Sequence, residues 1–194
     1  NLQPLGPAVP ARGWLVGRWF GRQVLRFLGW SFEGGIPNVP KAVVIVAPHT
    51  SNWDFVIGMA TKFAISLRAS WMAKHSLFFP PLGWIFRYFG GVPINRSAPH
   101  GVVEEIARAF RERDQLVMGV TPEGTRRQVE EWKTGFYRIA ERAGIPMAMV
   151  YLDYGKKVVG FAPSFLPTGD IDADMNRIKD YFRQFRGKHP QTIP

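Results

Sequence analysis

The sequence contains no cysteine among its 194 residues. This absence excludes a disulfide scaffold, a metal site built on thiolate ligands, and a cysteine nucleophile. The sequence also lacks the run of about 20 almost uncharged apolar residues that a membrane-spanning helix requires. Its longest clean apolar run, from Ala42 to Pro48, has the length of a buried strand instead.

Acidic residues are outnumbered, with 25 Lys and Arg against 15 Asp and Glu, which gives a net charge of +10. A hydrophobic fraction of 46% is typical of a globular chain. The excess of basic residues predicts an anionic partner, either nucleic acid, a phosphorylated metabolite or an acidic membrane surface. The four histidines stand far apart in the sequence without metal-ligand spacing, so no metal is expected.

No acidic residue precedes Glu33, whereas this first segment holds four Arg and three Trp. Arg18, Arg22 and Arg26 recur every four residues, which places them along one side of a helix. We predict that residues 1–35 form an amphipathic helical segment that lies in a lipid interface with its arginines near anionic headgroups. The alternative is an ordinary amphipathic helix that packs on the domain and exposes its arginines to water.

After this segment, predicted strands and helices alternate along the chain. This alternation predicts an α/β fold with a mostly parallel central sheet flanked by helices. Asn52 is the predicted N-cap of the first helix of this part. Five bulky side chains near residues 78–86 are predicted to pack in the core in preference to lining an acyl-chain tunnel: Phe78, Phe79, Trp84, Ile85 and Phe86. The predicted strands are 41–47, 70–74, 92–94, 116–120, 147–152 and 157–161, and the predicted helices are 53–67, 82–89, 98–113, 134–143 and 172–186.

Three loops that follow predicted strands carry ionisable or phosphate-binding side chains. They are residues 49–54, 95–97 and 121–126. In open α/β sheets, ligands bind beyond the carboxyl ends of the parallel strands. The sequence therefore predicts that these three loops meet in one site.

His49 and Asp54 are the candidate acid–base pair. Residues five apart lie about 140° apart around a regular helix, so the two side chains meet only if His49 precedes the helix. Pro48 and a cap at Asn52 favour that arrangement. A carboxylate on one imidazole nitrogen would leave the other nitrogen free as a base. Spacing alone leaves open the alternative of a loop histidine beside a first-turn carboxylate.

The second and third loops provide arginines. Arg96 and Arg126 offer planar donor forks that suit a phosphate, and Gly124 allows a close backbone approach. Lys133 extends the same candidate anion site more weakly. Taken singly, each arginine is equally typical of a solvated surface. No Gly-x-Ser-x-Gly elbow is present, so the sequence shows no serine nucleophile of that type. A general base without a nucleophile on the protein indicates that the substrate supplies the attacking hydroxyl.

His-x-x-x-x-Asp at 49–54, Asn-Arg-Ser at 95–97 and Pro-Glu-Gly-Thr-Arg at 122–126, in this order, resemble the blocks of the glycerolipid acyltransferase family. Gly-Ile-Pro at 144–146 resembles its fourth block, and the resemblance covers residues 41–151. It implies that residues 36–194 form the catalytic domain. It also implies transfer of a fatty acyl group from acyl-CoA or acyl carrier protein, as co-substrate, to the free hydroxyl of a lysophospholipid, above all 1-acylglycerol-3-phosphate. No cofactor is expected.

The resemblance also implies roles for individual residues. His49 would deprotonate the acceptor hydroxyl and Asp54 would orient His49, while Arg96 and Arg126 would bind the acceptor phosphate. The pocket would be shaped by Glu123, Gly124 and Thr125, with Asn52 and Lys133 as further substrate-binding candidates. Family members are typically membrane-associated, which implies a peripheral or monotopic protein on the cytoplasmic face of the cell membrane.

Two alternatives to this function remain. The family's second block often has an acidic residue before its arginine, whereas Asn95 stands here. The acceptor is therefore open, with lyso-ornithine lipid and other lysolipids as rivals. A basic module without catalysis, which binds an anionic membrane or nucleic acid, is the other class. The sequence carries no recognised nucleic-acid signature, so nucleic acid is not the expected partner.

Overall fold

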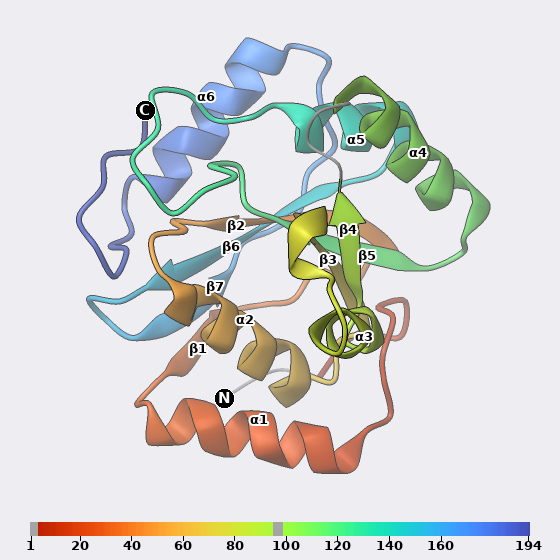
Figure 1. The fold of residues 1–194 in the computed structure, drawn as a ribbon. Coiled ribbons are helices and arrows are strands. Elements are labelled where there is room, and N and C mark those ends of the chain that lie inside the picture. The colour runs from red at the N-terminus through yellow and green to blue at the C-terminus, as the bar shows by residue number, and fades with distance from the viewer. Residues whose placement is uncertain (1–3, 95–98) are drawn as a thin grey trace.

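A seven-stranded sheet forms the centre of the computed structural model, which describes residues 4–94 and 99–194 (Figure 1). The strand order is β1-β7-β6-β2-β5-β3-β4. Five neighbouring strands run parallel, and the β1–β7 pair at one edge runs the opposite way because β6 and β7 pair antiparallel. The strands are β1 (Ser31–Gly34), β2 (Lys41–Ala47), β3 (Ala69–Lys74), β4 (Gly91–Ile94), β5 (Leu116–Val120), β6 (Met147–Asp153) and β7 (Val158–Phe161).

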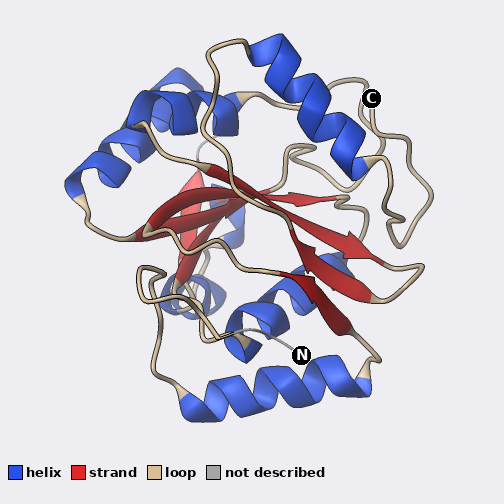
Figure 2. Ribbon diagram, turned by 180° about the vertical axis from the view of Figure 1, so that it is seen from behind, coloured by secondary structure: helices blue, strands red, loops and turns tan. Residues whose placement is uncertain are grey.

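Helices cover both faces of the sheet, as the α/β prediction requires. Helices α4, α5 and α6 lie on one face, α2 and α3 lie on the other, and α1 lies outside α2 (Figures 1 and 2). Within the described residues, no helix is both long and apolar enough to cross a bilayer. The helices are α1 (Leu15–Phe27), α2 (Asn52–Ala64), α3 (Leu82–Tyr88), α4 (Pro99–Glu112), α5 (Gly135–Ala143) and α6 (Ile171–Phe182), with a 3₁₀ turn at His75–Leu77.

Strand β2 is the central strand that the sequence predicts, with the same bounds. Its run of β-branched residues suits a strand that is buried on both faces. Val43 and Ile45 belong to the main core beneath α4, α5 and α6, whereas Val46 packs against the second core beneath α2. Because β5 and β6 flank β2 in parallel, the turn that follows β2 emerges at a fixed place on the carboxyl edge.

Helix α1 packs on α2 through a stripe of small residues. Gly17, Gly21 and Leu25 are its buried positions. A Cβ atom at Gly21 would come within 2.5 Å of the Ala60 carbonyl oxygen, so the two helix backbones approach closely. The outer face of α1 exposes large apolar side chains, namely Leu15, Val16, Trp19, Phe20 and Phe27.

Two sequence predictions about local structure are wrong. Residues 31–34 form strand β1, whereas the sequence pattern predicts them within the helical segment 1–35. The N-cap of α2 is Ser51, whose Oγ accepts from the Trp53 amide at 3.2 Å, and Asn52 is the first helical residue. β1 escapes prediction because its partner β7 lies more than 120 residues away in the sequence.

The predicted core role of the aromatic segment around α3 is wrong for three of its five side chains. Phe79, Trp84 and Ile85 are exposed. The other two side chains, Phe78 and Phe86, pack against the Trp71 ring. The amphipathic period of so short a helix does not reveal which of its faces meets the sheet.

Candidate active site

Two of the three predicted loops meet at the carboxyl edge of the sheet. β2 and β5 are parallel neighbours, so the turn after Ala47 and the turn after Val120 lie side by side. The remaining loop, residues 95–97, follows β4 and contains Arg96, which lies outside the described residues.

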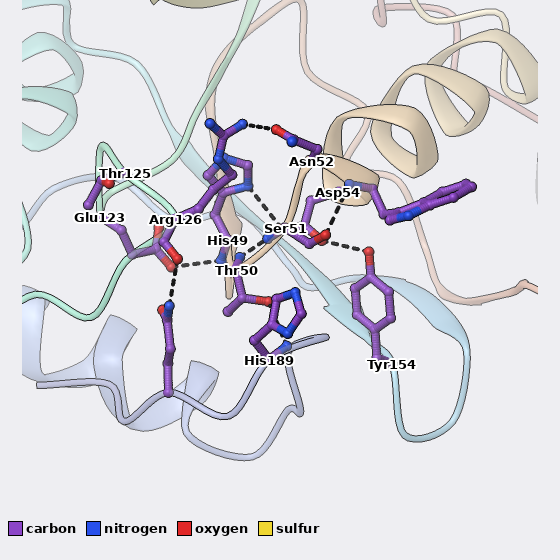
Figure 3. A network of polar contacts seen from close by, with 12 residues as sticks. His49, Thr50, Ser51, Asn52, Asp54, Glu123, Thr125, Arg126, Tyr154 and His189 are labelled. Carbon is purple, nitrogen blue, oxygen red and sulfur yellow. Dashed lines mark hydrogen bonds and ion pairs between the residues drawn. The ribbon is translucent and has the colours of Figure 1, made fainter.

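His49 and Asp54 form the pair that the first loop predicts. His49 Nδ1 lies 3.0 Å from Asp54 Oδ2 (Figure 3). His49 lies in the turn before α2, and Asp54 lies in the first turn of that helix, where its carboxylate also accepts from the Ser51 amide. The Asp54 side chain is 2% exposed and that of His49 is 19% exposed, so the ring reaches solvent while its partner does not.

Four donors hold the Asp54 carboxylate. Besides His49, the amides of Thr50 and Ser51 donate to Oδ2 at 2.7 and 2.8 Å, and the Tyr154 hydroxyl donates to Oδ1 at 2.6 Å. Burial by itself raises the pKa of Asp54, but the hydrogen bonds from His49, Tyr154 and the Ser51 amide outweigh it and lower the pKa below its usual value. The carboxylate is therefore charged and fixed in orientation.

Tyr154 is a site residue that the sequence did not reveal. It follows β6, 100 residues beyond Asp54, and its ring packs edge-on against Trp30 at 4.9 Å between centroids. Burial and the Asp54 charge raise the pKa of Tyr154, which keeps its hydroxyl protonated as a donor. No local motif marks this tyrosine, because only the β6–β7 connection brings it to α2.

Glu123 contacts the other side of the histidine turn. Its Oε1 accepts from the His49 backbone amide at 2.9 Å, and the residue is 5% exposed. Its Oε2 is buried and has no hydrogen-bond partner among the described residues. Burial raises the pKa of Glu123, the His49 amide opposes this rise, and the Asp54 charge adds to it. Glu123 thus ties the β5 loop to the His49 backbone.

Arg126 and Asn52 join the two loops at the surface. Arg126 Nη1 donates to Asn52 Oδ1 (Figure 3). The Gln191 side chain donates to the Arg126 carbonyl at 2.6 Å. The Arg126 side chain is exposed, and no carboxylate of the described residues lies within ion-pair distance of it. Its guanidinium therefore keeps donors for an anion.

The remaining predicted pocket residues lie on the same β5 loop. Gly124 has a φ of +64°, a conformation that favours glycine, and the Lys133 side chain passes 3.2 Å from where its Cβ would be. Lys133 is held by its amide, which donates to the Pro122 carbonyl at 2.9 Å. Thr125 is exposed beside Arg126. The loop thus presents these side chains, and through Glu123 and Arg126 it contacts the segment that carries His49 and Asn52.

The C-terminal segment, in which the sequence shows no motif, also contacts the site. The His189 amide donates to Thr50 Oγ1 at 3.2 Å, and Lys188 Nζ lies 4.9 Å from the centre of the Trp53 ring. Gln191 extends these contacts to Arg126. Residues 188–191 therefore connect the histidine turn with the β5 loop from outside the sheet.

With this geometry in place, comparison with known proteins decides the family. Residues 34–153, more than half of the chain, match the family described as Acyltransferase. The chain belongs to the acyltransferase family. The match spans β2 through β6 and includes every described candidate residue of the two loops.

Two curated relatives of this acyltransferase domain have the same name, 1-acyl-sn-glycerol-3-phosphate acyltransferase. The protein from Escherichia coli K12 is 28% identical over 153 residues, which cover 74% of this chain. The protein from Pseudomonas aeruginosa is 26% identical over 130 residues, or 63% of this chain. The matched regions span 61% and 49% of the length of these two relatives.

A solved structure with the same fold is the 1-acyl-sn-glycerophosphate (LPA) acyltransferase PlsC from Thermotoga maritima. It superimposes with a TM-score of 0.61 over 87% of this acyltransferase chain and 76% of that chain, at 18% sequence identity. At this identity the likeness shows a shared fold. The mostly parallel α/β architecture predicted from the sequence is thereby confirmed.

Proposed function

We propose that this domain transfers a fatty acyl group from acyl-CoA or acyl carrier protein to the free hydroxyl of 1-acylglycerol-3-phosphate, which gives phosphatidic acid. The observation that carries the proposal is the contact of 3.0 Å between His49 and the buried Asp54 at the carboxyl edge of the sheet. Membership of the acyltransferase family and the names of the two curated relatives support the same reaction.

The proposed reaction needs only one base. His49 holds its Nδ1 proton toward Asp54, so Nε2 takes the proton of the acceptor hydroxyl. The hydroxyl oxygen then attacks the thioester carbonyl, the new C–O bond forms, and the C–S bond breaks. The proton passes from the imidazolium to the leaving thiolate, which balances the step. The Asp54 carboxylate stabilises the transient imidazolium, and no acyl-enzyme is formed.

Arg126 supplies the proposed contact with the acceptor phosphate. Its side chain is exposed at the same carboxyl edge, and among the described residues it bonds to the neutral amide of Asn52. A phosphate would replace that neutral acceptor with a charged one, which strengthens the hydrogen bonds about twofold. Arg96 is proposed as the second phosphate ligand from its place in the sequence.

The test of the function is thiol release from acyl-CoA or acyl carrier protein in the presence of detergent-dispersed 1-acylglycerol-3-phosphate, with mass spectrometry of the lipid product. Release that depends on the acceptor and yields phosphatidic acid supports the proposal. A panel with lyso-ornithine lipid and other lysolipids separates a different acceptor from no activity at all. Release without any acceptor would contradict direct transfer to a lipid hydroxyl.

Replacement of Arg126 by Ala is expected to raise the acceptor KM at least tenfold, with a smaller change in kcat. The reason is that one charge-assisted hydrogen bond to a phosphate contributes about 1.5–3 kcal/mol. Steady-state kinetics with varied acceptor measures this effect. Arg127→Ala is the matched control, since Arg127 is a neighbouring exposed arginine with the same charge. An effect confined to the donor KM would contradict the phosphate assignment.

We also propose that the outer face of α1 attaches the enzyme to the surface of an anionic membrane, on the cytoplasmic side. Trp19 and Phe20 are 63% and 56% exposed, and Phe27 is 90% exposed. Exposed aromatic and aliphatic side chains on a helix with basic neighbours suit the boundary between headgroups and acyl chains. A lysophospholipid acceptor resides in that same layer.

The combined substitution of Trp19 and Phe20 by Gln is expected to abolish most binding to anionic vesicles, because it removes the largest apolar contacts with lipid. Vesicle sedimentation measures the bound fraction. The control is Leu166→Ser, which removes a side chain that is 59% exposed and lies outside α1. Deletion of the N-terminal segment is a poorer test of membrane binding. It would also remove Leu25 and Trp30, which are buried in the core, and so would disturb the fold. Unchanged sedimentation would exclude α1 as the membrane contact.

A further inference from the structure

A small hollow lined by three basic side chains lies where α1 begins and α2 ends. It is shallow and open to solvent, with room inside for about one water molecule, so a larger group would bind at its mouth against the basic side chains. The polar lining is basic apart from one serine, whereas the catalytic loops lie at the opposite end of α2. The lining residues are Arg12, Trp14, Arg18, Lys62, Phe63, Ser66 and Leu67.

Arg12 is held firmly at this hollow. Its amide donates to the Ser66 carbonyl at 2.8 Å, and its guanidinium stacks over Tyr88 at 4.8 Å and over Trp14 at 5.5 Å. Trp14 in turn packs edge-on against Phe63. The Arg12 guanidinium has no hydrogen-bond acceptor and no ion-pair partner among the described residues. Its N–H donors therefore stay available for an anion.

Lys62 adds a charge from α2. Its ammonium donates to the Phe89 carbonyl, which also accepts from the Trp71 indole at 3.2 Å. Burial and the nearby charge of Arg12 lower the pKa of Lys62 to about 8. Arg12 and Lys62 thus bring two positive charges to the same hollow. An anion between them would relieve that repulsion.

No protein carboxylate neutralises this cluster in the part of the chain that the structure describes. Arg12, Arg18 and Lys62 form no ion pair there. Residues 1–103 contain ten Lys and Arg but only two acidic residues, Glu33 and Asp54. Glu33 accepts from the Tyr151 hydroxyl, and Asp54 is engaged by His49. An anion that neutralises this cluster would therefore come from outside the chain.

We propose that the basic side chains at the mouth of this hollow bind the phosphate group of an anionic phospholipid in the membrane on which the enzyme lies. This inference rests on the proposed membrane attachment through α1, since the exposed Trp19 and Phe20 follow Arg18 directly on the same helix. Apolar side chains of an interfacial helix reach the acyl boundary, and the lipid phosphates lie just above it. The hollow thus gives the enzyme a specific headgroup contact besides its general positive charge.

Two double variants with the same loss of charge test this site. Arg12→Gln with Arg18→Gln removes two lining cations, whereas Arg22→Gln with Arg26→Gln removes two exposed arginines of α1 that do not line the hollow. The dissociation constant for phosphatidylglycerol-containing vesicles is measured against pure phosphatidylcholine vesicles. The first variant is expected to lose about tenfold more affinity than the second, as for one lost charge-assisted hydrogen bond. Equal losses would overturn the proposal, since general attraction alone predicts them.

A second measurement does not depend on those variants or on activity. The lysines of the whole chain are ¹³C-methylated, and the pKa of Lys62 is followed by NMR with short-chain phosphatidylglycerol or with inorganic phosphate. The lipid is expected to raise the pKa of Lys62 from about 8. A response to inorganic phosphate alone would overturn the lipid assignment. Full vesicle binding by the Trp19/Phe20 variant would instead contradict the membrane attachment.

Discussion

Replacement of His49 by Ala is expected to lower acceptor-dependent thiol release at least a thousandfold, with the fold unchanged. A positioned general base contributes about 10²–10⁴ in rate, and the structure provides no other imidazole paired with a buried carboxylate among the described residues. The assay is the thiol-release assay described above, run with the wild type and His49→Ala side by side. Circular dichroism and the melting temperature establish that the variant is folded.

His75→Ala is the matched control for this experiment. His75 is exposed in the 3₁₀ turn after β3 and has no place in the network around Asp54. Its variant should retain the wild-type rate and the wild-type membrane binding. A His49 variant that keeps most of its activity would remove the base from the mechanism and leave binding at the carboxyl edge as the only role of this loop.

Replacement of Asp54 by Asn is expected to have the second-largest effect and to change both rate and stability. An amide cannot hold the imidazole in the required tautomer or stabilise an imidazolium, and in related triads this change costs about 10⁴ in rate. The variant should therefore lose at least a hundredfold in kcat while the acceptor KM changes little. Tyr154→Phe removes only the hydrogen bond to Oδ1, so its loss of rate should be smaller.

The stability effect of Asp54→Asn should depend on pH in a defined direction. The pKa of Asp54 is lower in the folded chain than its usual value, so the ionised carboxylate stabilises the fold at neutral pH. That contribution is present above the unfolded pKa of about 4 and is lost as the pH falls through the folded pKa. Denaturant unfolding should show a stability gap of about 2 kcal/mol between wild type and variant at pH 7. The gap should shrink below about pH 4, and one that is constant from pH 7 to pH 3 would contradict the charged carboxylate.

The expected contact between His49 and Asp54 is present in the structure because its cause is local, while their catalytic role stays a prediction. A histidine in the turn before a helix and a carboxylate in its first turn are brought together by backbone geometry alone. The same locality explains why the strand at Lys41–Ala47 was predicted with its observed bounds. The cap was misassigned by one residue, to Asn52 in place of Ser51, because both residue types cap helices well.

Contacts between residues far apart in the chain could not be predicted from the sequence. Glu123 was predicted to shape a phosphate pocket, and the structure adds its bond to the His49 amide, which depends on β5 lying beside β2. Tyr154 reaches Asp54 only because the β6–β7 connection projects over the start of α2. Likewise, the exposed aromatic side chains of α3 depend on which of its faces meets the sheet.

The sequence by itself determined the alternation of strands and helices and placed His49 before the helix that carries Asp54, because hydrophobic period and short spacing act within a few residues. The tertiary structure alone decided which distant groups complete that pair and which cations converge at Arg12 and Lys62. Such contacts join segments 50 or more residues apart, and their energies depend on burial and charge in the folded state. No local pattern encodes that burial.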